Sequence, residues 1–187
     1  SSLNFNVILP IAGKDVSLAI GNNAKEQERE YSMSNKNIDI DFNDLVENYH
    51  EVIKYAGKNS DSFSVITNLK KPYSKNPPNC EHDEAIKCLE PFLTEHVVGI
   101  KEWPGMITKD NHKVMIIYRT CKESRKILSE MPNLFLPIEN QLPEDICFYR
   151  NKKPWLATVS HEKTAFMSDA TNDDIAFLND NGIMIYD

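Results

Sequence analysis

The stretch from Leu142 to Met167 constrains the fold more than any other part of this sequence. Residues typical of β-strands occur there in three short alternating runs, at 146–150, 155–159 and 164–167. An alternation with a period of two indicates strands with one buried face. Polar residues that favour turns separate the runs, first Asn151-Lys152-Lys153 and then His161-Glu162-Lys163. The pattern predicts a three-stranded antiparallel meander near the C-terminus.

Helical patterns alternate with further strand patterns in the rest of the chain. Apolar residues recur at helical spacing in four segments, at 41–57, 81–93, 120–131 and 172–181. Capping residues are expected at the start of three of these helices, namely Asp41, Thr120 and Thr171. Strands are expected at 3–11, 16–20, 62–69, 96–103, 113–119 and 183–186. The segments 97–103 and 113–119 could pair as an antiparallel hairpin.

Hairpins outnumber βαβ units in this order of elements. We therefore expect an α+β domain with a largely antiparallel sheet covered by about four helices, and a mixed α/β arrangement is the alternative. A chain of 187 residues suits a single domain over 1–187. Three polar or proline-containing segments predict loops, at 22–38, 70–80 and 132–144.

Composition restricts the class of binding partner and the cellular location that we expect for this protein. The net charge of −7 argues against a nucleic-acid-binding face, because such a face needs basic residues to contact phosphates. The sequence has no apolar run long enough to span a membrane, and its first ten residues lack the features of a signal peptide. Cysteine spacing does not suggest a secreted disulfide framework, so we expect reduced thiols and a cytoplasmic protein.

Several common catalytic motifs are missing from the sequence. The six glycines form neither of the two common nucleotide-binding patterns, G-x-x-x-x-G-K-[ST] and G-x-G-x-x-G. There is no G-x-S-x-G nucleophile elbow, and neither C-x-x-C nor H-E-x-x-H occurs. We therefore assign no catalytic residue and no cofactor, and we favour a function without catalysis.

Ser160-His161-Glu162-Lys163 is the segment with the most catalytic potential. His161 could act as a general base beside Glu162, and Cys147 on a neighbouring strand could be the nucleophile. The same tetrapeptide also suits a polar hairpin turn, and adjacent residues of a strand point to opposite faces. A small hydrolase or transferase that uses His161 and Glu162 is therefore one alternative function.

A zinc site is a second alternative. Cys80, His82 and Cys88 have the side chains that bind zinc. His82 and Cys88 are not four residues apart, so they do not share a helix face well, and no second paired motif supplies a fourth ligand. We assign no metal site and keep the three residues as candidates.

Aromatic and arginine residues suggest a recognition surface. Tyr149, Arg150 and Trp155 lie close together across the predicted hairpin, and Trp103 stands beside a Pro-Gly turn. Trp, Tyr and Arg dominate the energetic centres of protein interfaces. The four residues are candidate binding residues, and packing in the core is the other interpretation.

The tetrapeptide Leu-Pro-Glu-Asp at 142–145 resembles an element found in one family of immunity proteins. The resemblance covers these four residues and assigns a role to none of them. Chain size, acidity and the missing motifs lead us to expect a non-enzymatic protein that binds another protein. An immunity protein or a phage- or defence-associated regulator fits this expectation, and the formation of a homo-oligomer is left open.

Overall fold

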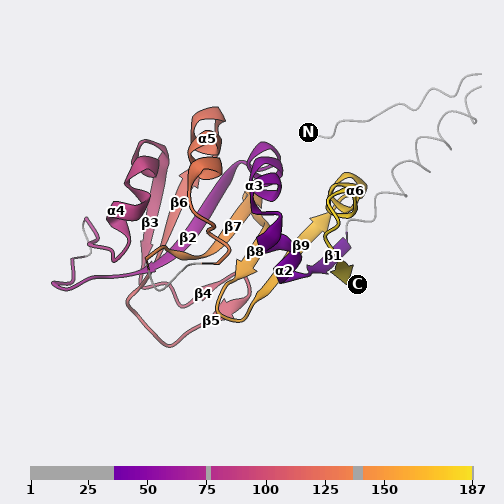
Figure 1. Ribbon diagram of the computed structural model, residues 1–187. Coiled ribbons are helices and arrows are strands. Elements are labelled where there is room, and N and C mark those ends of the chain that lie inside the picture. The colour runs from indigo at the N-terminus through magenta and orange to yellow at the C-terminus, as the bar shows by residue number, and fades with distance from the viewer. Residues whose placement is uncertain (1–35, 75–76, 137–140, 187) are drawn as a thin grey trace, which may run out of the picture. The chain divides into compact units, whose positions relative to one another are not determined.

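An antiparallel sheet organises the part of the chain that this computed structural model describes, residues 36–74, 77–136 and 141–186 (Figure 1). Its eight strands are β1 (Lys36–Ile40), β2 (Ser62–Asn68), β3 (Leu93–Val98), β6 (Lys113–Arg119), β7 (Glu144–Arg150), β8 (Lys153–Val159), β9 (Thr164–Ala170) and β10 (Ile185–Tyr186). They are arranged in the order β10-β1-β9-β8-β7-β2-β6-β3. All seven neighbouring pairs are antiparallel.

The predicted meander is present as β7, β8 and β9, which lie side by side in the sheet. Asn151 and Lys152 both have positive φ, as the tight turn between β7 and β8 requires. The predicted pairing of 97–103 with 113–119 is confirmed only in part, because β3 pairs with β6 but Glu102 and Trp103 pair instead with Ile107 and Met106. The α+β fold with a largely antiparallel sheet is therefore confirmed for the described residues.

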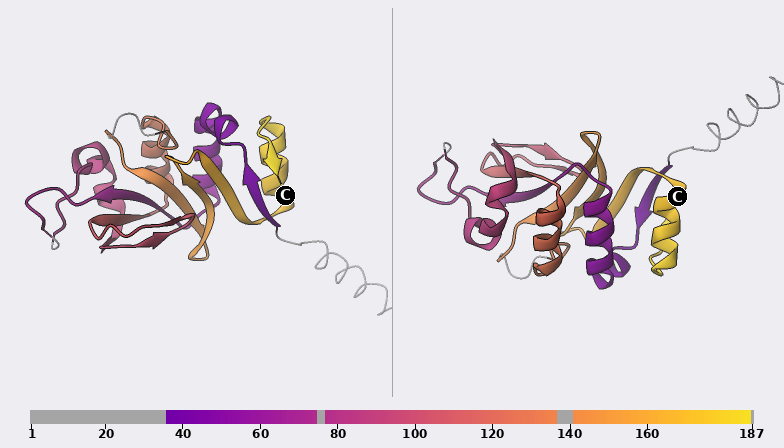
Figure 2. Two further views of the ribbon diagram at one scale, coloured as in Figure 1. Left: turned by 90° about the horizontal axis from the view of Figure 1, so that it is seen from below. Right: turned by 90° about the horizontal axis from the view of Figure 1, so that it is seen from above.

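Helices cover one face of this sheet (Figure 2). They are α2 (Phe42–Glu47), α3 (Tyr49–Lys58), α4 (Asp83–Ile86), α5 (Lys122–Glu130) and α6 (Asn172–Asp180), with a 3₁₀ helix η1 (Lys87–Phe92) directly after α4. The described part has five α-helices instead of about four, because the predicted helix at 41–57 breaks at Asn48. The Asn48 side chain donates to the Asp44 carbonyl and closes the end of α2. None of these helices is long and apolar enough to cross a membrane.

Several predicted boundaries were wrong. Helix α5 begins after Cys121 and not after Thr120, because the Ser124 hydroxyl accepts a hydrogen bond from the Cys121 N–H at 2.9 Å. Strand β1 occupies residues 36–40, which the sequence pattern placed partly in a loop at 22–38. The predicted strands at 3–11 and 16–20, and the rest of that loop, lie outside the described residues. The caps at Asp41 and Thr171 are confirmed.

Side chains of the central strands alternate between two cores. On the helical face, Phe63 and Phe148 are fully buried together with residues of α2, α3 and α5. On the opposite face, Ile66 and Met115 pack against Trp103 from a small hairpin, β4 (Glu102–Trp103) and β5 (Met106–Ile107). Strand β6 is therefore covered on both faces, as its nearly continuous apolar sequence predicted.

An ion pair at Arg150 joins the meander to two helices. Its guanidinium donates to both carboxylate oxygens of Asp174 at 2.7 and 2.8 Å, and its Nε donates to the Asn59 carbonyl. The guanidinium also lies 3.5 Å from the centre of the Trp155 ring. Tyr55 donates a further hydrogen bond to Asp174 at 2.8 Å. Strand β7, the end of α3 and the start of α6 are thus connected through one buried carboxylate.

The Arg150→Met variant should lose about 3–5 kcal/mol of unfolding free energy, because it leaves the Asp174 carboxylate buried without its cation. Urea unfolding followed by circular dichroism measures this loss. Lys109→Met removes an exposed lysine from the loop after β5 and should change the free energy by less than about 0.5 kcal/mol. Equal losses in the two variants would contradict the structural role of the Arg150 pair.

The same ion pair makes the free energy of unfolding depend on pH in the acidic range. Burial disfavours the charged carboxylate of Asp174, but hydrogen bonds from Arg150, Thr171 and Tyr55 outweigh burial and hold its pKa below the usual range. A carboxyl whose pKa is lower in the folded state stabilises the fold above the unfolded-state pKa of about 3.9, and this contribution is lost as the pH falls further. The free energy of unfolding should therefore fall more steeply between about pH 5 and pH 2 for the wild type than for Arg150→Met. Urea unfolding at a series of pH values measures this dependence.

Candidate functional site

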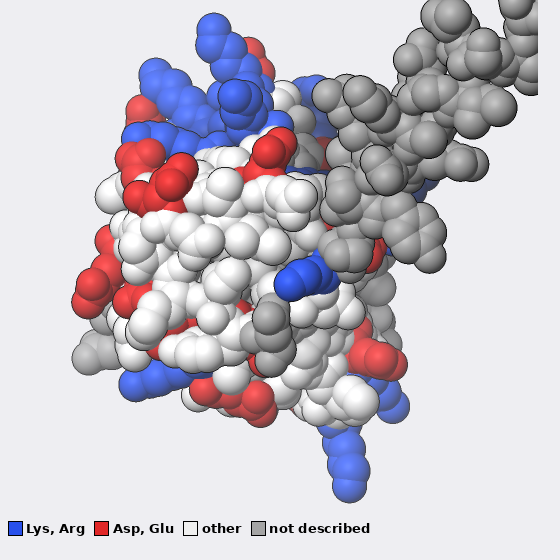
Figure 3. All heavy atoms as spheres, turned by 90° about the vertical axis from the view of Figure 1, so that its right-hand side faces the viewer, with Lys and Arg blue, Asp and Glu red and all other residues white. Residues whose placement is uncertain are grey.

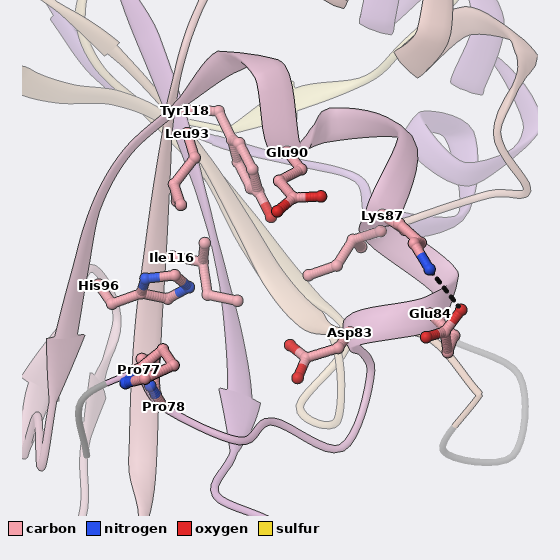
Figure 4. A pocket seen from close by; sticks show the side chains of 11 residues that line it. Pro77, Pro78, Asp83, Glu84, Lys87, Glu90, Leu93, His96, Ile116 and Tyr118 are labelled. Carbon is pink, nitrogen blue, oxygen red and sulfur yellow. Dashed lines mark ion pairs between the residues drawn. The ribbon is translucent and has the colours of Figure 1, made fainter. Parts of the chain in front are cut away.

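A cavity of about 290 Å³ lies between the α4–η1 segment and the strands β3 and β6 (Figure 4). Its floor consists of Leu93 and His96 from β3 and Ile116 and Tyr118 from β6. In the antiparallel register, Leu93 is opposite Tyr118 and His96 is opposite Ile116, and directly opposed residues share a face. The floor is therefore an extension of the helical-face core to the edge of the sheet.

The rim of the cavity carries more acidic than basic groups. Asp83, Glu84, Lys87 and Glu90 line it from α4 and η1, where spacings of three and four residues place side chains on one side. Lys87 is 3.5 Å from Glu84 and offsets its charge. Glu90 is exposed and forms no ion pair with any described residue. The rim therefore presents negative charge above an apolar floor.

The Tyr118 hydroxyl has no hydrogen-bond partner among the described residues. Tyr118 is only 2% exposed, and Figure 4 shows its side chain directed toward Glu90. Burial raises the pKa of Tyr118, and the negative charge of Asp83 raises it further. Among the described residues, the buried side-chain atom that lacks a partner is Trp155 Nε1, so the Tyr118 hydroxyl is open to the cavity. An unpaired hydroxyl that lines a cavity therefore indicates a place where a ligand group can bind.

Strand β3 forms the edge of the described sheet next to this cavity. The Gly99 N–H donates to the Lys113 carbonyl at 2.8 Å, and the alternation of an antiparallel ladder then turns the N–H groups of His96 and Val98 outward. Neither lysine nor proline, which often protect edges, occurs in β3. The strand thus offers backbone donors and acceptors beside the cavity.

The four predicted binding residues do not form one exposed face. Trp103 and Trp155 are 6% and 2% exposed, so both tryptophans are packing residues here. The Tyr149 hydroxyl lies 2.9 Å from Ser64 Oγ, and Arg150 is held in its ion pair with Asp174. No signal in the sequence pointed instead to the cavity beside β3, because its residues come from three separate segments.

The predicted catalytic candidates differ in solvent exposure, because Cys147 is buried and His161 and Glu162 are exposed. Cys147 is 2% exposed, and burial raises the pKa of its thiol to about 12, which opposes formation of the nucleophilic thiolate. His161 and Glu162 lie in the exposed β8–β9 turn, with Nε2 and Oε1 3.9 Å apart. The enzyme alternative remains a prediction, and Cys147 is poorly suited to the role of its nucleophile.

The turn at His161 lies against the start of β7. The Ser160 N–H donates to the Asp145 carboxylate at 2.8 Å, and the Trp103 indole donates to its other oxygen at 2.8 Å. Burial raises the pKa of Asp145, although these two hydrogen bonds act in the opposite direction. Ligand atoms of Glu144, Asp145 and His161 lie within 4.8 Å of one another. The sequence pattern marked the segments 142–145 and 160–163 separately but did not predict that they are in contact.

Cys80, His82 and Cys88 do not form a comparable group. Within the described ranges, Glu144, Asp145 and His161 are the one set of three candidate metal ligands that meets this distance criterion. His82 is buried with its Nδ1 2.7 Å from the Thr67 hydroxyl, and Cys88 is exposed. Cys80, His82 and Cys88 therefore do not form a preformed three-ligand zinc site.

Comparison with known proteins identified no relative of this chain. No protein-family model matches the chain, and no curated protein or solved structure matches it either.

Thiol labelling tests the burial of the cysteines in these regions. In native protein, Cys88 should react first with Ellman's reagent because it is exposed, and Cys121 should react more slowly. Cys80 and Cys147 should react only after unfolding, because burial raises the pKa of each thiol to about 12. Mass spectrometry of digests identifies the sites, and Cys88→Ser should remove the fast phase. Fast native labelling of Cys147 would contradict the structure and revive its catalytic role.

Proposed function

We propose that this chain is a non-enzymatic, cytoplasmic protein-binding module that takes up an extended basic segment of another protein at β3. The observation that carries the proposal is the cavity beside this edge strand, with an acidic rim and the unpaired Tyr118 hydroxyl. The segment would extend the sheet by pairing with β3 and would insert one lysine or arginine side chain into the cavity.

Charge favours a basic side chain in this cavity. Glu90 and Asp83 stand near the Tyr118 hydroxyl, and Lys87 is the one lysine or arginine among the described residues that line the cavity. A lysine or arginine head group is a hydrogen-bond donor, so the carboxylates and the hydroxyl oxygen can accept from it. An acidic or neutral ligand would leave this concentration of negative charge without compensation.

Size and surface favour one long side chain over a larger ligand. A volume of about 290 Å³ lies at the lower limit of typical small-molecule pockets. Ile86, Leu93 and Ile116 offer apolar surface for the methylene groups of such a side chain. Lysine and arginine commonly pack their stems on apolar surface while the charged head contacts polar groups.

The opposite edge of the sheet is less suited to a basic partner. There β10 is only two residues long, and Figure 3 shows broad uncharged surface at this end of the molecule, with charged side chains mainly around it. At β3 the outward N–H groups lie directly beside the cavity. Backbone pairing provides affinity and a side-chain pocket provides specificity when a strand adds to a sheet edge.

A partner of this chemistry is consistent with a role as an immunity protein or a phage- or defence-associated regulator. Such a protein neutralises its target by occupying a surface and needs no catalytic group of its own. The net charge of −7 would favour encounter with a basic target. All four cysteines are free thiols, which supports the cytoplasmic location.

Selection of a random heptapeptide display library against the full chain tests the proposal. Enriched peptides should carry a lysine or arginine among β-branched residues, and fluorescence polarisation should show direct binding of the synthetic peptide. Glu90→Gln should weaken this binding about tenfold, because it removes a charge-assisted hydrogen bond. Tyr118→Phe should also weaken binding.

Two matched controls separate specific docking from general charge attraction. Glu130→Gln removes an exposed acid from the end of α5 and should leave the affinity unchanged. A peptide with N-methyl groups on alternate backbone nitrogens should lose binding, because it cannot pair with β3. The proposal fails if enriched peptides lack basic residues, or if Glu90→Gln and Glu130→Gln affect binding equally.

A further inference from the structure

Two sequence segments that lie 15 residues apart meet at a cluster of metal-ligating side chains. Glu144 and Asp145 stand at the start of β7, and His161 stands in the turn after β8. One ligand atom from each of the three lies within 4.8 Å of the other two. We propose that this cluster binds a divalent transition-metal ion, with Mn²⁺ or Zn²⁺ as the best-matched ions. The proposal is independent of the docking site beside β3.

The ligand set determines the class of ion. Two carboxylates and one imidazole give oxygen and nitrogen donors without sulfur. Carboxylates suit manganese and magnesium, whereas imidazole suits zinc and other transition ions. A mixed set therefore favours an intermediate ion such as Mn²⁺ or Zn²⁺ over Mg²⁺ or Ca²⁺, which bind oxygen donors.

Asp145 is held in place by groups that would surround a bound ion. Its Oδ2 accepts from the Trp103 indole and its Oδ1 accepts from the Ser160 N–H, each at 2.8 Å. The Asp145 N–H in turn faces the Ser160 hydroxyl at 3.3 Å. Each carboxylate oxygen has two acceptor positions, so these bonds leave one position on each oxygen for a metal. Outer hydrogen bonds of this kind orient ligating carboxylates in known metal sites.

The ion pair between Lys113 and Glu144 marks this place as favourable for a cation. The Lys113 ammonium contacts only one Glu144 oxygen, and the two carboxylates together carry more charge than it offsets. A metal ion would compete with the ammonium for Glu144. Replacing Lys113 by an uncharged residue should therefore strengthen metal binding, which a purely structural ion pair would not predict.

The exposed side of the cluster leaves room for further ligands. His161 is exposed, and Glu162 Oε1 lies 3.9 Å from His161 Nε2. Three protein ligands with open positions are typical of metal sites that also bind water or substrate. Glu162 is close enough to serve as a fourth ligand when the turn adjusts.

Titration of the full chain with Mn²⁺, followed by electron paramagnetic resonance of free Mn²⁺, tests the proposal. We expect one bound equivalent. His161→Ala should weaken binding tenfold or more, and its exposure means that the fold is retained. Lys113→Met should tighten binding several-fold. His50→Ala, which removes an exposed histidine from α3, should have no effect.

Manganese also distinguishes this cluster from the cysteines. Thiolates select softer ions, so Mn²⁺ should bind equally well to Cys88→Ser. Absence of bound Mn²⁺ at millimolar concentration in both the wild type and Lys113→Met would overturn the proposal. Equal affinities of His161→Ala and the wild type would also overturn it, because the ion would then bind elsewhere.

Discussion

The antiparallel register of β2 and β6 is the constraint on which the rest of the structure depends. Seven consecutive residue pairs, from Ser62 opposite Arg119 to Asn68 opposite Lys113, align the two strands without a bulge. This register places Phe63 and Tyr118 in the helical-face core and Ile66 and Met115 in the opposite core. A slip by one residue would exchange the two faces, so both cores depend on the same set of backbone hydrogen bonds.

Both proposed sites lie where this two-sided packing ends. The cavity beside β3 continues the floor of the helical-face core to the edge of the sheet, where the Tyr118 hydroxyl faces the cavity without a hydrogen-bond partner among the described residues. The metal-ligand cluster lies at the start of β7, where Trp103 from the β4–β5 hairpin reaches the Asp145 carboxylate. Gly105 permits this approach, because a Cβ there would lie 2.6 Å from a methyl group of Val159 and its φ is +84°. The cavity and the metal-ligand cluster therefore both lie at the margins of the two hydrophobic cores.

Local patterns predicted the elements better than they predicted the sites. The meander, the pairing of β3 with β6 and the caps at Asp41 and Thr171 follow from alternation, turn residues and short-range hydrogen bonds. Strand β1 was missed in part because only two apolar residues, Ile38 and Ile40, signal it. Backbone pairing with β9 and β10 stabilises β1 as a strand, and these partners are more than 120 residues away in the chain.

The sequence alone determined the α+β class, the C-terminal meander and the absence of common catalytic motifs, because these depend on residue type and spacing within short windows. Tertiary structure decided which polar side chains meet. Tryptophans that suggested a recognition surface are buried, whereas Asp145 and His161 are brought together. Glu90 and Tyr118, which no motif marked, share a cavity. The physical reason is that strand order and register, which set these distances, arise from contacts between segments remote in the chain.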